Sequence, residues 1–409
     1  MGFGILLLYP IYIKILGEEQ WGLVSACISI QAMLMILDVG FSQIMPRDIA
    51  QAHSKLDVNN IYQSYFLYYF TISILGGSLI FIFSNWLSEN WFNAESYISE
   101  LKMIIKIASL QFIFQFLNSV NSGFWNGIQN QKITNISQVS FFTLKHISSL
   151  LLLMIYPSAI IYIICFTSIT IIEFFTNFTY IKIKNKLKVT LNRVIALETW
   201  NIVKNNSSFS LGVILGVCVS QLDKILFSQQ LSIKEYGIYV VVAQLGLAFL
   251  QLQYPVMKAI IPAVSARGKD SLFNIISPKY IMLLAIFTLS PALFTSIYSY
   301  EILLLWTGNE YIAHIGHLAL SLICLSVILN LPYGFIYANL LRKRKGFVIL
   351  IVNFTSILIM LSYYFCYSNK ENLMTGGVLW LIYAFTSLII GCSSLYFINK
   401  KKSINTLYS

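Results

Sequence analysis

The chain has 409 residues, of which 57% are hydrophobic and only 11% are charged, and its formal net charge is +11. Soluble globular proteins carry about 25% charged residues, so this excess of apolar surface excludes a water-soluble core and requires lipid as the solvent. The lysines and arginines lie in short segments between apolar stretches, which is typical of membrane proteins and argues against a nucleic-acid-binding protein.

A membrane-spanning helix needs about 20 mainly apolar residues. The chain contains twelve stretches of this kind, and Pro157 marks the turn between the fifth and the sixth because proline resists helix continuation. In chain order they cover residues 1–16, 21–45, 61–83, 103–124, 135–156, 158–181, 207–229, 237–262, 279–299, 317–340, 347–368 and 376–398. We therefore predict an all-α integral membrane protein with twelve transmembrane helices.

A short element near the start of the chain recurs near its middle. Residues 16–22 read LGEEQWG and residues 231–237 read LSIKEYG, and each copy precedes an apolar stretch that ends at a proline, Pro46 or Pro262. Repetition at half the chain length predicts a duplicated bundle, which is the architecture of secondary transporters. Because the second copy has a longer helix before it than the first copy has, we expect several residues to be missing at the N-terminus.

The positions of the basic residues predict the orientation and the domain boundaries. When the N-terminus is placed inside, most of the 27 lysines and arginines fall on the inner side, so we expect both termini in the cytoplasm. Six helices return the chain to its own side, so the two halves form a parallel repeat. The predicted parts are a six-helix bundle over 1–181, a basic cytoplasmic linker over 182–206, a second six-helix bundle over 207–399 and a basic tail over 400–409.

Ionisable side chains at membrane depth cost about 2.5–3.5 kcal/mol each and usually face a water-filled interior. Four basic residues are candidates to attract an anionic substrate: Lys145, Lys106, Arg47 and Lys258. The alternative for the two lysines within helices, Lys106 and Lys145, is that the ammonium group extends to the membrane interface.

A second set of intramembrane charges consists of candidates for ion coupling or helix pairing: Asp38, Glu173, Asp223 and Lys224. Asp38 lies two residues before Gly40, so it fits either a proton or cation site, or a hydrogen bond between closely packed helices. His314 and His317 have metal-ligand spacing but no third ligand nearby, so no metal site is predicted.

No cofactor and no enzymatic activity are expected. The chain has no GxxxxGK[ST] phosphate-binding motif and no loop of the size of a catalytic domain. We therefore expect transport to be coupled to an ion gradient, the membrane potential or a later reaction.

Several short motifs occur together and in order: Leu16-Gly17 with Trp21-Gly22, Asp38-x-Gly40 followed by Arg47, residues 127–131 (GIQNQ), and Asp223-Lys224 followed by residues 235–239 (EYGIY). Over essentially the whole chain they resemble the O-antigen and capsule oligosaccharide flippases called Wzx. These belong to a superfamily that includes the multidrug and toxic-compound extruders (MATE) and the lipid II flippase. The chain departs from the family at Asn126, where the family often has arginine.

The resemblance implies a MATE-like pair of six-helix bundles that works by alternating access in the bacterial inner membrane. The implied cargo is an oligosaccharide repeat unit on undecaprenyl pyrophosphate, with membrane lipids, a polysaccharide polymerase and a chain-length regulator as candidate partners and no nucleic acid. Coupling to protons or sodium, which the resemblance also implies, would give Asp38 or Glu173 a role.

Two other functions stay open at this stage. A drug or organic-cation exporter of the same fold would favour acidic rather than basic residues in its lumen, and this chain has a mixture. A membrane polysaccharide polymerase usually carries a large outer loop, whereas the longest outer loop predicted here, over residues 84–102, is short and acidic.

Overall fold

The computed structural model describes residues 2–185, 193–266, 282–342, 345–366 and 372–407. In these ranges the chain forms helices and no β-strand, which confirms the predicted all-α class. The α-helices are α1 (Gly2–Leu16), α2 (Glu18–Leu34), α3 (Phe41–Ala50), α4 (Lys55–Trp86), α5 (Ile98–Gly127), α6 (Gln131–Leu153), α7 (Ala159–Asn185), α8 (Arg193–Asn205), α9 (Ser207–Phe227), α10 (Ile233–Ala266), α13 (Ser290–Ile297), α14 (Ser299–Thr307), α15 (Glu310–Arg342), α16 (Gly346–Cys366) and α17 (Met374–Leu407). Four single turns complete the list: η1 (Met35–Asp38), η2 (Leu87–Trp91), η3 (Glu95–Tyr97) and η4 (Ala285–Leu289).

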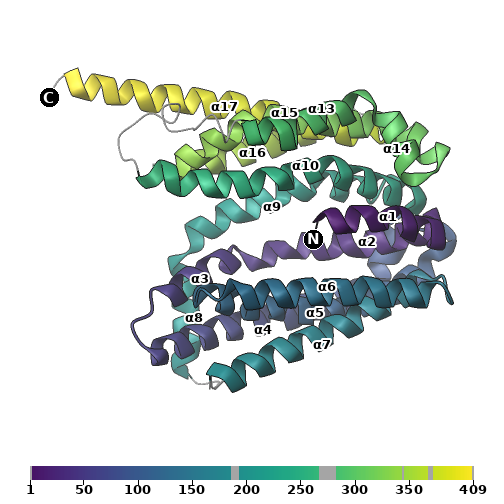
Figure 1. Cartoon of the computed structure of the whole chain (residues 1–409), viewed down its shortest axis with the longest axis horizontal. Coiled ribbons are helices and arrows are strands. Elements are labelled where there is room, and N and C mark those ends of the chain that lie inside the picture. The colour runs from purple at the N-terminus through teal and green to yellow at the C-terminus, as the bar shows by residue number, and fades with distance from the viewer. Residues whose placement is uncertain (1, 186–192, 267–281, 343–344, 367–371, 408–409) are drawn as a thin grey trace. The chain divides into compact units, whose positions relative to one another are not determined.

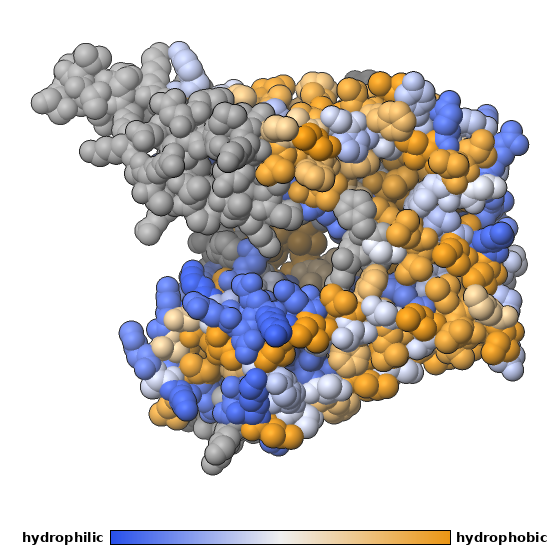
Figure 2. Space-filling view, in the orientation of Figure 1, coloured by the Kyte–Doolittle hydropathy of each residue, from blue (hydrophilic) through white to orange (hydrophobic). Residues whose placement is uncertain are grey.

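Within the described residues, ten helices are long and apolar enough to cross a membrane. An eleventh span results if Met282–Ile297 and Ser299–Thr307, which meet at a bend of 92°, are counted as one, and α1 adds a shorter apolar helix. Together these correspond to the twelve predicted stretches. Large apolar side chains such as Leu79, Ile82, Leu151 and Leu305 are exposed, and Figure 2 shows hydrophobic residues over much of the visible surface. Such extensive exposed apolar surface is what a lipid environment requires.

The chain divides into two compact units, and each unit takes a short segment from the opposite half of the sequence. The first unit contains Tyr12–Val217 and Ser232–Gly237, and the second contains Gly2–Ile11, Cys218–Leu231 and Ile238–Ser409. In the first unit α5 packs against α3, α4, α6 and α7, and the long helices α4, α5, α6 and α7 lie side by side in Figure 1. In the second unit α15 packs against α13, α14 and α17, and α16 packs against α17. The bundle boundaries inferred from the sequence stay a prediction.

The two copies of the repeated sequence element pack against each other within the first unit. A side chain at Gly22 would overlap the backbone of Ile233, and a Cβ at Gly237 would lie 2.7 Å from the Cα of Gly22. Lys234 in the second copy pairs with Glu18 in the first at 2.7 Å. The close approach of the two backbones explains why both copies of the element end in glycine.

The second predicted helix, over residues 21–45, is not continuous. Helix α2 ends at Leu34, one 3-10 turn leads to Asp38, and α3 begins at Phe41. Val39 and Gly40 both adopt left-handed backbone conformations, with φ of 46° and 82°. Left-handed conformations cannot continue a right-handed α-helix, so the expectation of one straight helix was wrong at this position.

The hydrophilic stretch over 182–206, expected to be a loop, contains helix α8. Ile195 is buried, and α8 packs on α4 through the hydroxyl of Thr199, which donates to the carbonyl of Ser64 at 3.1 Å. The hydroxyl of Ser64 in turn donates to Glu198 at 3.2 Å. Ile195, Thr199 and Ile202 recur at helical spacing, and this amphipathic pattern distinguishes the segment from a loop.

Candidate functional site

One face of α5 carries a row of polar side chains through an otherwise apolar helix. Gln115, Asn118, Ser119, Ser122 and Asn126 follow one another at intervals of one, three or four residues, which places them on the same side of the helix. Together with Ser42 of α3, Gln138 of α6 and Gly123, they line a pocket of about 260 Å³, which we call the amide pocket. All of its lining side chains are uncharged amides or hydroxyls, apart from the glycine.

Asn118 connects the amide pocket to a network of buried polar groups between α5 and α7. Its side-chain amide donates to Glu173 at 2.9 Å. Its amide oxygen accepts from Asn121 at 3.2 Å and from Asn177 at 3.0 Å. Satisfied buried networks of this kind hold side chains in fixed positions. The pocket therefore has one wall whose hydrogen-bonding groups are fixed before any ligand arrives.

The structure brings together two predicted site residues that are 28 positions apart. The ammonium group of Lys145, on α6, lies 2.7 Å from Glu173, on α7, and the two side chains are 18% and 10% exposed. Each charge of the pair compensates the other, as two ionised side chains with little exposure to solvent require. In this structure the Lys145 ammonium is therefore paired with Glu173 and is not a free cation that could attract an anionic substrate.

Asp38 lies next to the lining residue Ser42 of the amide pocket, at the break between η1 and α3. It is buried and accepts hydrogen bonds from the backbone N–H of Ser42 at 3.3 Å and from the Ser42 hydroxyl at 2.8 Å. The hydroxyl of Tyr69 also donates to it. Ser42 and Asn118 both line the pocket. Ser42 bonds to Asp38 and Asn118 bonds to Glu173, so each buried carboxylate contacts one residue of the pocket lining.

The remaining basic candidates are not part of this site. The Lys106 ammonium lies over the ring of Phe81, 5.3 Å from its centroid, and Phe81 is an exposed residue of α4. Arg47 is 58% exposed and bonds to Asp48 at 3.1 and 3.2 Å, in a second pocket between α3, α4 and α8. Lys258 lies in α10, and its side chain is outside the part of the chain that the structure describes.

Asp223 and Lys224 lie in the second unit, where they form a separate buried cluster. Asp223 accepts from the hydroxyl of Tyr239 at 2.5 Å and from the indole N–H of Trp380 at 2.9 Å. Lys224 lies 3.4 Å from the same carboxylate, and both side chains are less than 10% exposed. Because Tyr239 and Trp380 come from α10 and α17, Asp223 on α9 ties three helices together.

The site residues predicted from the sequence are all ionisable, so they do not include the amides of the first unit. Asn118, Asn121 and Asn177 carry the hydrogen-bond network, and Gln115 and Gln138 line the pocket. The signal was present in the sequence, since the polar residues of α5 recur on one helical face. A polar stripe of this kind in a membrane-spanning helix indicates a face turned toward protein or water.

Comparison with known proteins identifies the family. The family described as "Polysaccharide biosynthesis protein" matches residues 3–267, which is more than half of the chain. The chain belongs to this family. No curated protein sequence matches it.

Solved structures share the fold at low sequence identity. An inward-facing multidrug resistance MATE family transporter of the MOP superfamily aligns with a TM-score of 0.72 and 13% identity, over 98% of this chain and 95% of the other. The lipid II flippase MurJ, in an inward closed conformation, aligns with a TM-score of 0.70 and 13% identity, over 95% and 86%. A MOP superfamily transporter from Pyrococcus furiosus aligns with a TM-score of 0.58 and 14% identity, over 100% and 94%.

These similarities confirm the MATE-like fold expected from the sequence. The family is described by its part in polysaccharide biosynthesis, and the fold is shared with solved transporters and a flippase. Together with the apolar spans of the described residues, this makes the chain a multi-pass membrane protein of a polysaccharide-biosynthesis family.

Proposed function

We propose that the protein is a flippase that moves undecaprenyl-pyrophosphate-linked oligosaccharide repeat units, of O-antigen or capsule, across the bacterial inner membrane by alternating access. The observation that carries this proposal is the chemistry of the amide pocket. Its lining amides and hydroxyls can both donate and accept hydrogen bonds, as the hydroxyl groups of a sugar require. The family assignment supports the same substrate class.

The same lining argues against the competing exporter. An organic cation would be bound by acidic or aromatic groups facing it, whereas the pocket presents neutral amides. The two carboxylates next to the pocket are already bonded to lining or neighbouring residues. The basic segments between the spans support an orientation with both termini in the cytoplasm.

Asn118 provides the test of this function. Asn118→Ala removes the residue that joins the pocket to Glu173 and leaves donors on Asn121 and Asn177 without their acceptor, so we expect a loss of most transport activity. The measurement is the amount of lipid-linked oligosaccharide that a membrane-impermeant lectin reaches on spheroplasts of a deletion strain complemented with each variant. We expect completed repeat units to accumulate on the cytoplasmic side.

The matched control is Asn90→Ala, because Asn90 is an exposed amide in η2, away from the residues that line the pocket. It should restore transport like the unaltered protein. Repeat units that reach the outer face of the deletion strain but stay unpolymerised would contradict the proposal and indicate a polymerase. A normal surface polysaccharide in the deletion strain would also contradict it and favour the exporter.

Asp38 is the better candidate for coupling to protons or sodium. It accepts hydrogen bonds from the neutral donors Ser42 and Tyr69, whereas Glu173 is bonded to a lysine. No lysine or arginine of the described residues forms an ion pair with Asp38, so a coupling ion would not have to displace a lysine there, as it would at Glu173. We infer that Asp38 carries the coupling ion.

Asp38→Asn is therefore expected to keep the fold but to remove the dependence of transport on the ion gradient. The measurement is transport into vesicles of purified protein and lipid-linked oligosaccharide, with and without an imposed pH or sodium gradient. Glu301→Gln, an exposed carboxylate of α14, serves as the control. A variant that responds to the gradient as strongly as the unaltered protein would exclude Asp38 from coupling.

A further inference from the structure

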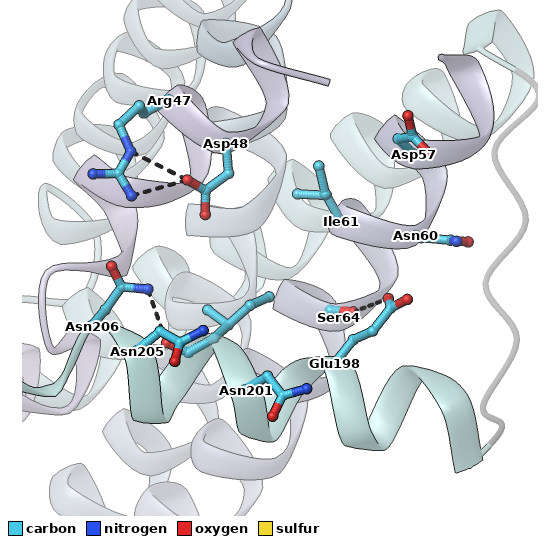
Figure 3. Close-up of a pocket in the computed structure, with 11 residues that line it drawn as sticks. Arg47, Asp48, Asp57, Asn60, Ile61, Ser64, Glu198, Asn201, Asn205 and Asn206 are labelled. Atoms are coloured by element: carbon cyan, nitrogen blue, oxygen red, sulfur yellow. Dashed lines mark hydrogen bonds and ion pairs between the residues drawn. The ribbon is translucent and has the colours of Figure 1, made fainter. Parts of the chain in front are cut away.

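A pocket of about 650 Å³ lies in the first unit between α3, α4 and α8. Sites for small molecules usually have volumes of about 300–1,000 Å³. We call this the α8 pocket, and Figure 3 shows its lining side chains on the three helices. Its lining residues are Arg47, Asp48, Asp57, Asn60, Ile61, Ser64, Glu198, Asn201, Ile202, Asn205 and Asn206. Hydrophilic residues gather at this end of the first unit in Figure 2.

The charges of the α8 pocket are predominantly negative. Arg47 is bonded to Asp48, so these two lining charges neutralise each other, and the Tyr65 hydroxyl donates to Asp48 at 2.7 Å. Asp57 and Glu198 then remain without a basic residue among the lining side chains. Each accepts a hydrogen bond through one carboxylate oxygen: Asp57 accepts from the backbone N–H of Ser54 at 3.1 Å, and Glu198 accepts from the hydroxyl of Ser64. Both carboxylates line the pocket, so among the described residues each has an oxygen that can bind a ligand there.

The other lining groups suit a sugar. Asn60, Asn201 and Asn205 present side-chain amides, which match the donor and acceptor pattern of vicinal hydroxyls. Ile61 and Ile202 add apolar surface, which suits the C–H face of a pyranose ring. In Figure 3, Asn201 and Glu198 project from α8, and Ser64 of α4 is joined to Glu198. Unpaired carboxylates attract protonated amines and repel carboxylates and phosphates.

We propose that the α8 pocket is a second sugar-binding site, which accepts neutral or amine-bearing sugars of the transported head group and discriminates against acidic ones. This inference rests on the proposed flippase function and adds the charge of the cargo to it. With the termini in the cytoplasm, the turn between α3 and α4 and the segment with α8 lie on the cytoplasmic side, where a lipid-linked repeat unit waits for transport. The pocket therefore selects the cargo by its sugars and leaves the pyrophosphate outside the site.

The test measures binding of three soluble probes to the full-length protein in lipid nanodiscs by isothermal titration calorimetry. The probes are a chitosan trimer, which carries amines, a chitin trimer, which is neutral, and a trimer of galacturonic acid, which is acidic. We expect the first two to bind and the acidic trimer to bind much more weakly. Glu198→Gln should lower the affinity for the chitosan trimer about tenfold, because a hydrogen bond to a charged group is lost. The affinity for the chitin trimer should stay almost unchanged.

The matched control is Glu89→Gln, an exposed carboxylate in η2 that does not line the pocket, and it should bind all three probes like the unaltered protein. Equal binding of the acidic trimer, failure of all probes to bind, or an unchanged affinity of Glu198→Gln for the chitosan trimer would each overturn the inference. Unaltered melting of Glu198→Gln confirms that its fold is intact.

The lectin assay on spheroplasts separates this inference from the proposed function. If the deletion strain accumulates repeat units inside but the probes do not distinguish Glu198→Gln from the unaltered protein, the pocket inference fails and the flippase stands. If the deletion strain displays repeat units outside as usual, the flippase proposal fails, whatever the probes bind.

Discussion

Lys145→Ala is expected to destabilise the protein by about 3–5 kcal/mol, because removal of one partner of a buried ion pair leaves the other charge uncompensated. Glu173 would remain in the bundle with its side chain only 10% exposed, and it would keep the hydrogen bond from Asn118 but lose its cation. The measurement is thermal unfolding of the purified protein in detergent, detected as the loss of the monodisperse peak in size-exclusion chromatography. The same variant should be less abundant in the membrane.

Two further variants separate the effect of breaking the ion pair on stability from the effect of losing any lysine. Lys106→Ala removes a cation that lies over an exposed ring, a contact that contributes about 0.5–1 kcal/mol, so its melting should change little. Lys145→Met combined with Glu173→Gln removes both charges and keeps an acceptor for Asn118, so it should regain most of the lost stability. A Lys145→Ala variant that melts like the unaltered protein but does not transport would assign Lys145 to the substrate instead.

The positions of the membrane spans follow from the sequence because they depend on a local property, the length of an apolar stretch. The exceptions are the places where backbone conformation or a short apolar face determines where a helix begins or ends. The break at Val39 and Gly40 interrupts a stretch that is apolar enough to be one helix, and the residues Asp38-Val-Gly were its only signal. Helix α8 was hidden for the opposite reason, since it is too polar to span a membrane but has an apolar face toward α4.

The pairing of charged residues could not be predicted from the sequence. Lys145 and Glu173 were assigned to different roles, one to a basic lumen and one to ion coupling, yet they form a single ion pair. Their contact depends on the rotation of α6 and α7 about their own axes, which the composition of neither helix determines. Asp223 and Trp380 are 157 positions apart and meet through the packing of α9 and α17 for the same reason.

The neutral amides show a different limit. Asn118 has no charge, so a search for costly intramembrane groups passes over it, although it connects three other side chains. The helical spacing of Gln115, Asn118, Ser122 and Asn126 would have identified the polar face of α5. If the proposed sugar substrate is right, this face is more informative than the charges, since amides can bind hydroxyl groups.

Asp223→Ala is expected to destabilise the protein by about 3–5 kcal/mol, because it removes the carboxylate that pairs with Lys224, whose side chain is only 8% exposed. It also removes the acceptor for Tyr239 and Trp380, two donors in the interior of the second unit, and an unsatisfied buried donor adds to the cost. The measurement is again thermal unfolding in detergent. Asp223→Asn keeps one acceptor oxygen for these donors, so its loss of stability should be smaller.

The control for Asp223 is Glu301→Ala, which removes an exposed carboxylate from the same unit and should leave the melting unchanged. Asp223→Ala combined with Lys224→Met removes both charges and should recover part of the loss, since an apolar replacement for a buried pair is often tolerated. Because Asp223 ties α9 to α10 and α17, it acts as a structural link between helices. A stable Asp223→Ala variant without transport would contradict that role and would place Asp223 beside Asp38 as a second coupling residue.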